Sequence, residues 1–169
     1  LEDMKGKHLG FADPDSTSGF LVPSVALPKE LGVELDEYFS ETSFNGGHEN
    51  NVLAVLDGKV DGGVTWSSGV GEYSEGYTSG NIRKMVDKGL LDMEVVIWRS
   101  PLIPNGPIVV RADLDKDVRA KFKDYMMNLP ESNPDCFSAI QGGTYNGFVE
   151  VDHSFYETIV AARKAKIGG

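Results

Sequence analysis

Three consecutive hydroxyl side chains, Ser16, Thr17 and Ser18, stand directly before Gly19, where a short apolar run gives way to a helical pattern. The first N–H groups of a helix have no partner within the helix, and the helix dipole adds partial positive charge there. Rotatable hydroxyl donors and a glycine that permits close backbone approach would complete an oxyanion site. A helix cap needs only one hydroxyl, so the alternatives are an anion site and a capped helix start with two surplus polar residues.

Two further side chains are candidates for the same site. His48 follows Asn45-Gly46-Gly47 at the predicted start of a second helix, where its imidazole can donate to an oxyanion; the alternative is an exposed or capping histidine. Trp66 ends the third predicted strand and either walls a pocket or packs against the sheet. Ligands of open α/β sheets bind beyond the carboxyl ends of the strands, which directs attention to the loops at 13–19, 45–49 and 66–72.

Motifs for catalysis and metal binding are missing from the sequence. His8, His48 and His153 lack metal-ligand spacing, and there is no nucleophile elbow, P-loop or dinucleotide-binding glycine motif. The single cysteine, Cys136, has no activating histidine or cation nearby and is predicted to be a small buried apolar residue. These absences favour binding over catalysis, with no cofactor and no metal.

The composition limits the classes of partner. The 169 residues carry a formal net charge of -10, which disfavours nucleic acid and anionic membranes but leaves room for a local anion site. Hydrophobic residues make up 40% of the chain, enough for a packed core. No stretch approaches the ~18 apolar residues of a membrane span, and no signal peptide precedes Leu1. We therefore expect a chain that is mature, truncated or cytosolic.

The elements that must position these residues alternate between strand and helix at the spacing of βαβ units. Strands are predicted at residues 8–12, 42–44, 60–66, 93–98 and 108–111, and helices at 16–31, 48–57, 81–88, 114–129 and 154–165. Pro28 is expected to kink or end the first helix. The apolar face of the second helix is predicted to consist of Val52, Leu53, Val55 and Leu56.

Several motifs, in order along almost the whole chain, resemble the phosphonate- and phosphite-binding receptors of ABC transporters. They are DPDSTSGFLVP at 13–23, FNGGH at 44–48, VLAVLDGKVDGG at 52–63, SPLIPNGPIVVR at 100–111 and GGTYNGF at 142–148. The resemblance implies an α/β fold of the second periplasmic-binding-protein type, in which two lobes close on a ligand. It implies one intact lobe at 5–97, a hinge crossing at 98–107, and the C-terminal part of the other lobe at 107–169.

The same resemblance implies the site and its partners. Ser16, Thr17, Ser18 and His48 would hold the phosphorus oxygens. Gly19 and Trp66 remain candidates on the grounds of their own chemistry and position. The implied partners are a small phosphorus oxyanion and the membrane permease and ATPase of an importer, without nucleic acid. The implied location is the periplasm, or an extracytoplasmic lipid anchor.

Two departures from the family pattern matter. Receptors of this family carry about one further half-lobe before the position of Leu1, so we expect a half-built site and either self-association or a separate N-terminal fragment. Receptors that prefer aminoalkylphosphonates place carboxylates at the positions aligned with Ser68 and Gly106, which puts an amine-bearing ligand in doubt. The alternatives are a sensory or regulatory ligand-binding domain of a larger protein and a fragment of an anion-using transferase.

Overall fold

The computed structural model describes residues 1–167, and this range contains a three-stranded parallel sheet of order β2-β1-β3. Strand β1 (His8–Phe11) lies in the centre, between β2 (Glu41–Phe44) and β3 (Gly62–Gly63). Phe11 is opposite Phe44 in one pair, and Leu9 is opposite Gly62 in the other. The predicted alternation of strand and helix with parallel strands is confirmed for this part of the chain.

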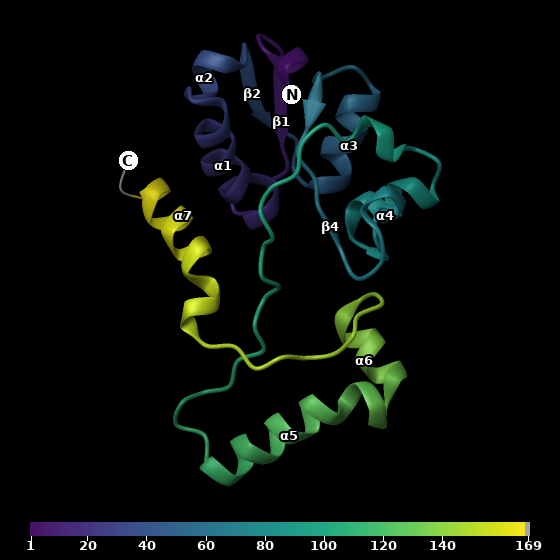
Figure 1. Cartoon of the computed structure of the whole chain (residues 1–169), viewed down its shortest axis with the longest axis vertical. Coiled ribbons are helices and arrows are strands. Elements are labelled where there is room, and N and C mark those ends of the chain that lie inside the picture. Colours follow the sequence, from purple (N-terminus) through teal and green to yellow (C-terminus); the bar gives the residue numbers. More distant parts are fainter. Residues whose placement is uncertain (168–169) are drawn as a thin grey trace.

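Helices cover both faces of this sheet (Figure 1). On one face, Leu9 and Phe11 pack in a core cluster with Leu27 of α1 (Val22–Leu31). The short helix α2 (Leu35–Tyr38) follows α1 and adds partly buried residues to the same cluster. On the other face lies α3 (His48–Leu56), which contacts β1 and β3. Residues of β1 therefore alternate between two helical layers, as the period of a strand requires.

A buried asparagine explains why two strands carry glycine where they face α3. Asn51 is 0% exposed, and its Nδ2 donates to the carbonyl oxygens of Gly10 (2.9 Å) and Val64 (2.7 Å). A Cβ atom at Gly10 would lie 2.3 Å from Asn51 Oδ1, and one at Gly63 would lie 3.1 Å from Asn51 Nδ2. The glycines thus make room for a polar side chain that joins β1 to the segment after β3.

Two predicted strands are wrong. Residues 93–98 begin with a 3-10 turn, η4 (Met93–Val95), and residues 108–111 are extended but belong to no strand of the described chain. The apolar, β-branched run that predicts a strand at 108–111 lies exposed, with Val109 at 78%. A strand needs a neighbouring strand to pair its N–H and C=O groups, and residues 1–167 bring none beside it. The third predicted strand, 60–66, contributes only Gly62 and Gly63 to the sheet.

The first two helices differ in detail from the prediction. The first starts with a π-helical turn, η2 (Thr17–Leu21), and continues as α1 through Pro28 to Leu31. Pro28 therefore does not end the helix; the left-handed Gly32 does, with its N–H donating to the Pro28 carbonyl at 2.9 Å. In the second helix, Leu53 and Leu56 are 37% and 53% exposed, because α3 turns Asn51 toward the sheet.

A second part of the chain lies apart from the sheet and is joined to it by two extended crossings (Figure 1). It contains α5 (Lys116–Ser132), whose first turn is capped by Asp115, and α6 (Pro134–Gln141). The chain then returns through the turn η5 (His153–Tyr156) to α7 (Glu157–Ile167), which packs against α1 and η2. The predicted helices at 114–129 and 154–165 are present within a few residues, while the lobe boundaries at 97 and 107 stay predictions.

The remaining elements lie before β1 and after β3 in the sequence. They are η1 (Glu2–Met4), β4 (Ser67–Ser68), η3 (Tyr73–Glu75) and α4 (Gly80–Asp87). None of the helices within residues 1–167 has the length and apolar character to cross a bilayer.

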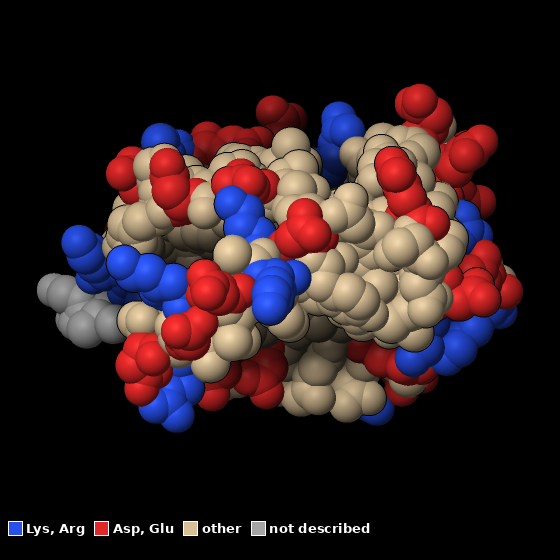
Figure 2. Space-filling model, turned by 90° about the horizontal axis from the view of Figure 1, so that it is seen from below, with Lys and Arg blue, Asp and Glu red and all other residues tan. Residues whose placement is uncertain are grey.

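Seen from the α5 side, Lys and Arg side chains alternate with Asp and Glu, and no basic stripe of the kind that nucleic acid requires forms on this face (Figure 2).

Candidate oxyanion-binding site

The Ser16 loop begins the first helix beyond the carboxyl end of β1. Ser16 has extended backbone angles, and its Oγ accepts the N–H of Gly19 at 2.9 Å, so this one hydroxyl caps the helix. The preceding turn is held by Asp13, whose carbonyl accepts the N–H of Ser16 at 3.0 Å. In the described chain, no hydrogen bond engages the N–H groups of Thr17 and Ser18. The helix start therefore keeps free N–H donors and two hydroxyls that the cap does not need.

Gly19 is fixed by close packing against its surroundings. A Cβ atom there would lie 2.5 Å from Ala12 Cβ, 2.8 Å from His48 Cε1 and 2.9 Å from Ser16 Oγ. Its carbonyl accepts the N–H of Ala12 at 3.1 Å, which ties the helix start to the end of β1. Only glycine lets the serine loop, β1 and the histidine loop approach this closely.

His48 meets the serine loop from the N-terminus of α3. Its Nε2 lies 3.2 Å from Ser16 Oγ and 3.4 Å from Ser18 Oγ. The loop before it is tied to the same end of β1, because Asn45 N–H donates to Phe11 O (3.0 Å) and Gly47 N–H donates to Ala12 O (2.7 Å). The structure thus brings Ser16, Ser18, Gly19 and His48 together, at the sheet edge where the sequence places them.

Burial lowers the pKa of the His48 imidazole below its ordinary value of 6.5, since desolvation disfavours the cation. Its Nδ1 is buried and has no hydrogen-bond partner in the described chain. Burial therefore favours the neutral form of the ring. A bound oxyanion would oppose this effect, because negative charge beside the ring favours the imidazolium.

We expect a pH dependence of stability that originates at His48. As the pH falls below about 6.5, the unfolded chain takes up the imidazole proton before the folded chain does, so acid shifts the equilibrium toward unfolding. Denaturant unfolding between pH 8 and pH 5 should show a loss of stability that His48→Gln reduces. The same substitution at the exposed His153 provides the matched comparison. Equal profiles for wild type and His48→Gln would contradict this assignment.

Trp66 lies next to His48 but also borders another hollow. Its ring centroid is 6.1 Å from that of His48, with the ring planes tilted by 59°. The indole also lines an open groove of about 630 Å³, together with Ser79, Asn81 and Gly142. The lining of the groove does not include the Ser16 loop or His48, so Trp66 borders both regions. No group of three or more His, Cys, Asp or Glu side chains in residues 1–167 is arranged to hold a metal ion.

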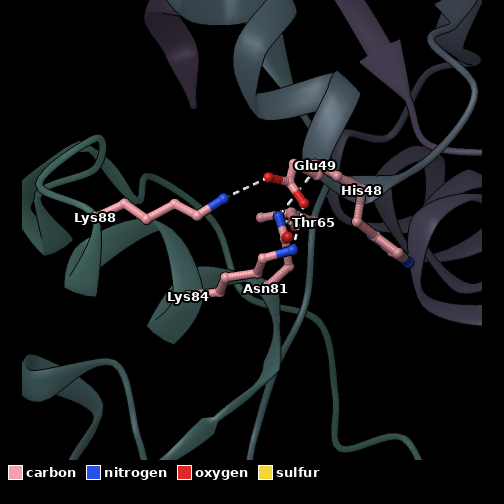
Figure 3. A network of polar contacts seen from close by, with 6 residues as sticks. All are labelled: His48, Glu49, Thr65, Asn81, Lys84 and Lys88. Carbon is pink, nitrogen blue, oxygen red and sulfur yellow. Dashed lines mark hydrogen bonds and ion pairs between the residues drawn. The ribbon is translucent and has the colours of Figure 1, made fainter.

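Helix α4 clamps the N-terminus of α3 (Figure 3). Asn81 Nδ2 donates to the carbonyl oxygen of His48 at 3.1 Å and to Thr65 Oγ1 at 2.9 Å. Glu49, the next residue, pairs with Lys84 and, at 2.6 Å, with Lys88. Hydrogen bonds from these lysines lower the pKa of Glu49 to about 2, so the carboxylate is ionised across the neutral range. The backbone that carries His48 is thereby fixed independently of the imidazole.

Sequence reasoning missed Asn51 and its partner Asn45. Asn45 Nδ2 donates to Asn51 Oδ1 at 2.6 Å, so the asparagine that joins the strands also holds the loop before His48. The sequence contains one indication of the role of Asn51. Position 51 lies one helical turn before Val55, on the face that is expected to be apolar. A polar residue on that face, opposite strands containing glycine, indicates a buried hydrogen-bonding role.

Taken together, a parallel sheet with a serine-rich helix start and a histidine beyond its carboxyl edge defines an α/β domain with the arrangement that the sequence motifs predict. Residues 1–156 match the family described as ABC transporter, phosphonate, periplasmic substrate-binding protein, and the chain belongs to this family. The members are substrate-binding proteins, so the expectation of binding rather than catalysis is confirmed at the level of the family.

Named relatives agree with this membership. The phosphonates-binding periplasmic protein of Escherichia coli (strain K12) is 32% identical over 128 residues, which cover 76% of this chain and 34% of that protein. A phosphate-import protein of Mycolicibacterium smegmatis is 32% identical over 130 residues, which cover 73% of this chain and 37% of that protein. The chain thus spans about a third of the length of these curated relatives.

A solved structure shows the same fold. The binding-protein component of an ABC phosphonate transporter from Pseudomonas aeruginosa matches with a TM-score of 0.63 and 25% sequence identity. The match covers 98% of this chain and 51% of the other. The expected periplasmic-binding-protein fold, present in part, is therefore confirmed.

Proposed function

We propose that this chain carries the oxyanion-binding loops of a non-catalytic solute receptor for a small phosphorus oxyanion: a phosphonate, phosphite or phosphate. One observation carries the proposal: at the start of a helix, the hydroxyls of Ser16 and Ser18 lie 3.2 Å and 3.4 Å from His48 Nε2 of the neighbouring loop. Free N–H groups, rotatable hydroxyls and a titratable ring are the donors that a tetrahedral anion requires. Thr17 and Trp66 complete the proposed ligand-binding set.

The number of available donors is sufficient for useful affinity. Hydrogen bonds to a charged group contribute about 1.5–3 kcal/mol each. Two N–H groups, two hydroxyls and the imidazole would together contribute about 7.5–15 kcal/mol, part of which the entropy of association offsets. Micromolar binding corresponds to about 8 kcal/mol, so an affinity in this range requires most of these donors to contact the anion.

The wider setting of this receptor is part of the proposal. Residues 5–97 form the lobe with the anion-binding loops, 98–107 form a hinge crossing, and 107–169 contribute to the second lobe. Family membership supports an extracytoplasmic receptor that delivers its ligand to the permease and ATPase of an importer, in the periplasm or from a lipid anchor. A sensory domain of a larger protein remains the second candidate, since it would use the same fold and the same loops.

Titration of the full-length protein against phosphite, methylphosphonate, phosphate, sulfate and 2-aminoethylphosphonate tests the proposed ligand class. We expect compact phosphorus oxyanions to bind more tightly than 2-aminoethylphosphonate, because a buried ammonium without a carboxylate costs several kcal/mol. Ser68 offers only a hydroxyl, which already accepts a hydrogen bond from Tyr145 at 3.1 Å.

The exposed Glu72 is the carboxylate that could overturn this preference. If 2-aminoethylphosphonate binds most tightly, and Glu72→Gln removes that advantage, then Glu72 meets the ammonium and the predicted preference is wrong. Binding of sulfate alone would contradict a receptor for phosphorus oxyanions.

The exposed apolar residues of the second part predict self-association of the 169-residue chain. Leu102 is 96% exposed, Val109 78% and Val149 74%, and residues 108–111 offer unpaired backbone groups. Light scattering at micromolar concentrations is expected to show dimers or larger species, unless a separate N-terminal fragment covers this surface. A stable monomer, with no second fragment in the mass spectrum, would contradict this expectation.

A further inference from the structure

One short loop of the second part reaches across to the sheet-containing part. Tyr145 OH donates to Ser68 Oγ at 3.1 Å, and Thr78 Oγ1 donates to the carbonyl oxygen of Thr144 at 3.2 Å. In the described chain, these are the two hydrogen bonds between residues 113–150 and residues 1–97. Both come from adjacent residues of the loop that follows α6.

The same loop is seated directly on the opposite surface. A Cβ atom at Gly143 would lie 2.7 Å from Ser79 Oγ and 2.9 Å from Ser79 Cβ. Ser79 is 8% exposed, so the loop backbone covers it closely. A larger residue at position 143 could not make this contact without displacing the loop.

The surface that receives the loop is rigid. Ser67 and Ser68 are bridged in antiparallel fashion to Gly80 and Ser79, and the N–H of Ile82 donates to Trp66 O at 3.1 Å. The side chain of Thr78 is also held in place, because its Oγ1 accepts the N–H of Val70 at 2.9 Å. The backbone that carries the Ser68 and Thr78 hydroxyls is therefore held in place by hydrogen bonds. Ser68 follows Trp66 by two residues in the sequence, and Thr78 follows it by twelve.

We propose that residues 142–145 form a latch that holds the two parts closed beside the oxyanion site, with Tyr145 and Ser68 as its side-chain contact. The parts are joined by extended crossings, so their relative placement depends on contacts of this kind (Figure 1). Trp66 connects the latch to the site, since its ring lies 6.1 Å from His48 and shares the groove with Gly142. The latch rests on the proposed function and adds to it a group that controls ligand release.

The test uses the full-length protein with inorganic phosphate and methylphosphonate as probes. Tyr145→Phe and Ser68→Ala should each weaken binding about threefold to tenfold, the effect of one hydrogen bond. A latch slows escape, so the loss should appear as faster dissociation with association changed less than about twofold. The double variant should be no weaker than either single variant, because both remove the same bond. Ser68→Thr keeps a hydroxyl and should restore slow dissociation.

Tyr125→Phe is the matched control, because Tyr125 lies on α5 and is 54% exposed. Additive single effects, or dissociation rates equal to wild type, would overturn the latch. If the wild-type protein binds neither probe, the proposed function is wrong. The contact between the two parts is then tested in the absence of ligand. Small-angle scattering should in that case show a larger radius of gyration for Tyr145→Phe than for Tyr125→Phe, and equal radii would refute it.

Discussion

Replacing Asn51 by alanine is expected to lower the free energy of unfolding by about 3 kcal/mol. The side chain is fully buried and makes three hydrogen bonds, two as donor to Gly10 O and Val64 O and one as acceptor from Asn45. Alanine would leave Val64 O and the Asn45 amide without these partners, in a space shaped by glycines that cannot refill it. Denaturant unfolding monitored by circular dichroism measures the loss.

The neighbouring Asn50 provides a matched control on the same helix. It is exposed, and its Nδ2 donates to Gly46 O at 3.3 Å, so Asn50→Ala should stay within about 0.5 kcal/mol of wild type. Asn51→Ala should also weaken oxyanion binding, because the loop before His48 loses the contact from Asn45 to Asn51. A stability change below about 1 kcal/mol would contradict the structural role assigned to Asn51.

Replacing Thr17 and Ser18 together by alanine is expected to weaken oxyanion binding about 100-fold, with each substitution contributing about tenfold. Each hydroxyl would donate a charge-assisted hydrogen bond to the anion, and neither caps the helix, since Ser16 accepts the Gly19 N–H. The free energy of unfolding should therefore change by less than about 0.5 kcal/mol. Calorimetric titration of the full-length protein measures the affinity.

Ser24 provides a control in which stability is expected to change and affinity is not. It lies further along the same helix, is 5% exposed, and donates from Oγ to Leu21 O at 3.0 Å. Ser24→Ala should change stability slightly and leave the affinity unaltered. If the variant lacking both the Thr17 and Ser18 hydroxyls binds like wild type, the Ser16 loop is not part of the binding site.

The sequence predicts the convergence of the Ser16 loop and His48 better than it predicts the sheet, for a physical reason. Ser16, Gly19 and His48 are recognisable because helix N-termini and the glycines before them act through local chemistry. Their meeting follows from one rule, that parallel strands end at the same edge. The convergence at 3.2 Å and 3.4 Å required no further information about packing.

Features that depend on contacts between residues far apart in the sequence could not be predicted from local sequence patterns. The role of Asn51 depends on Gly10 and Val64, which lie 41 and 13 residues away. The predicted strand at 108–111 fails because strand formation needs a neighbour, and β-branched residues alone do not supply one. The exposure of Leu53 likewise depends on which side of α3 meets the sheet.

The return of α7 to α1 has a consequence for the order of events during synthesis. Lys166 lies 5.1 Å from the centre of the Phe20 ring, so the start of the first helix is covered by chain made almost 150 residues later. At about 5–20 residues per second, a ribosome needs roughly 7–30 seconds to make the chain between these two residues. Until then, the outer side of α1 and η2 stays accessible to chaperones, and the sheet-containing part cannot finish folding while it is being made.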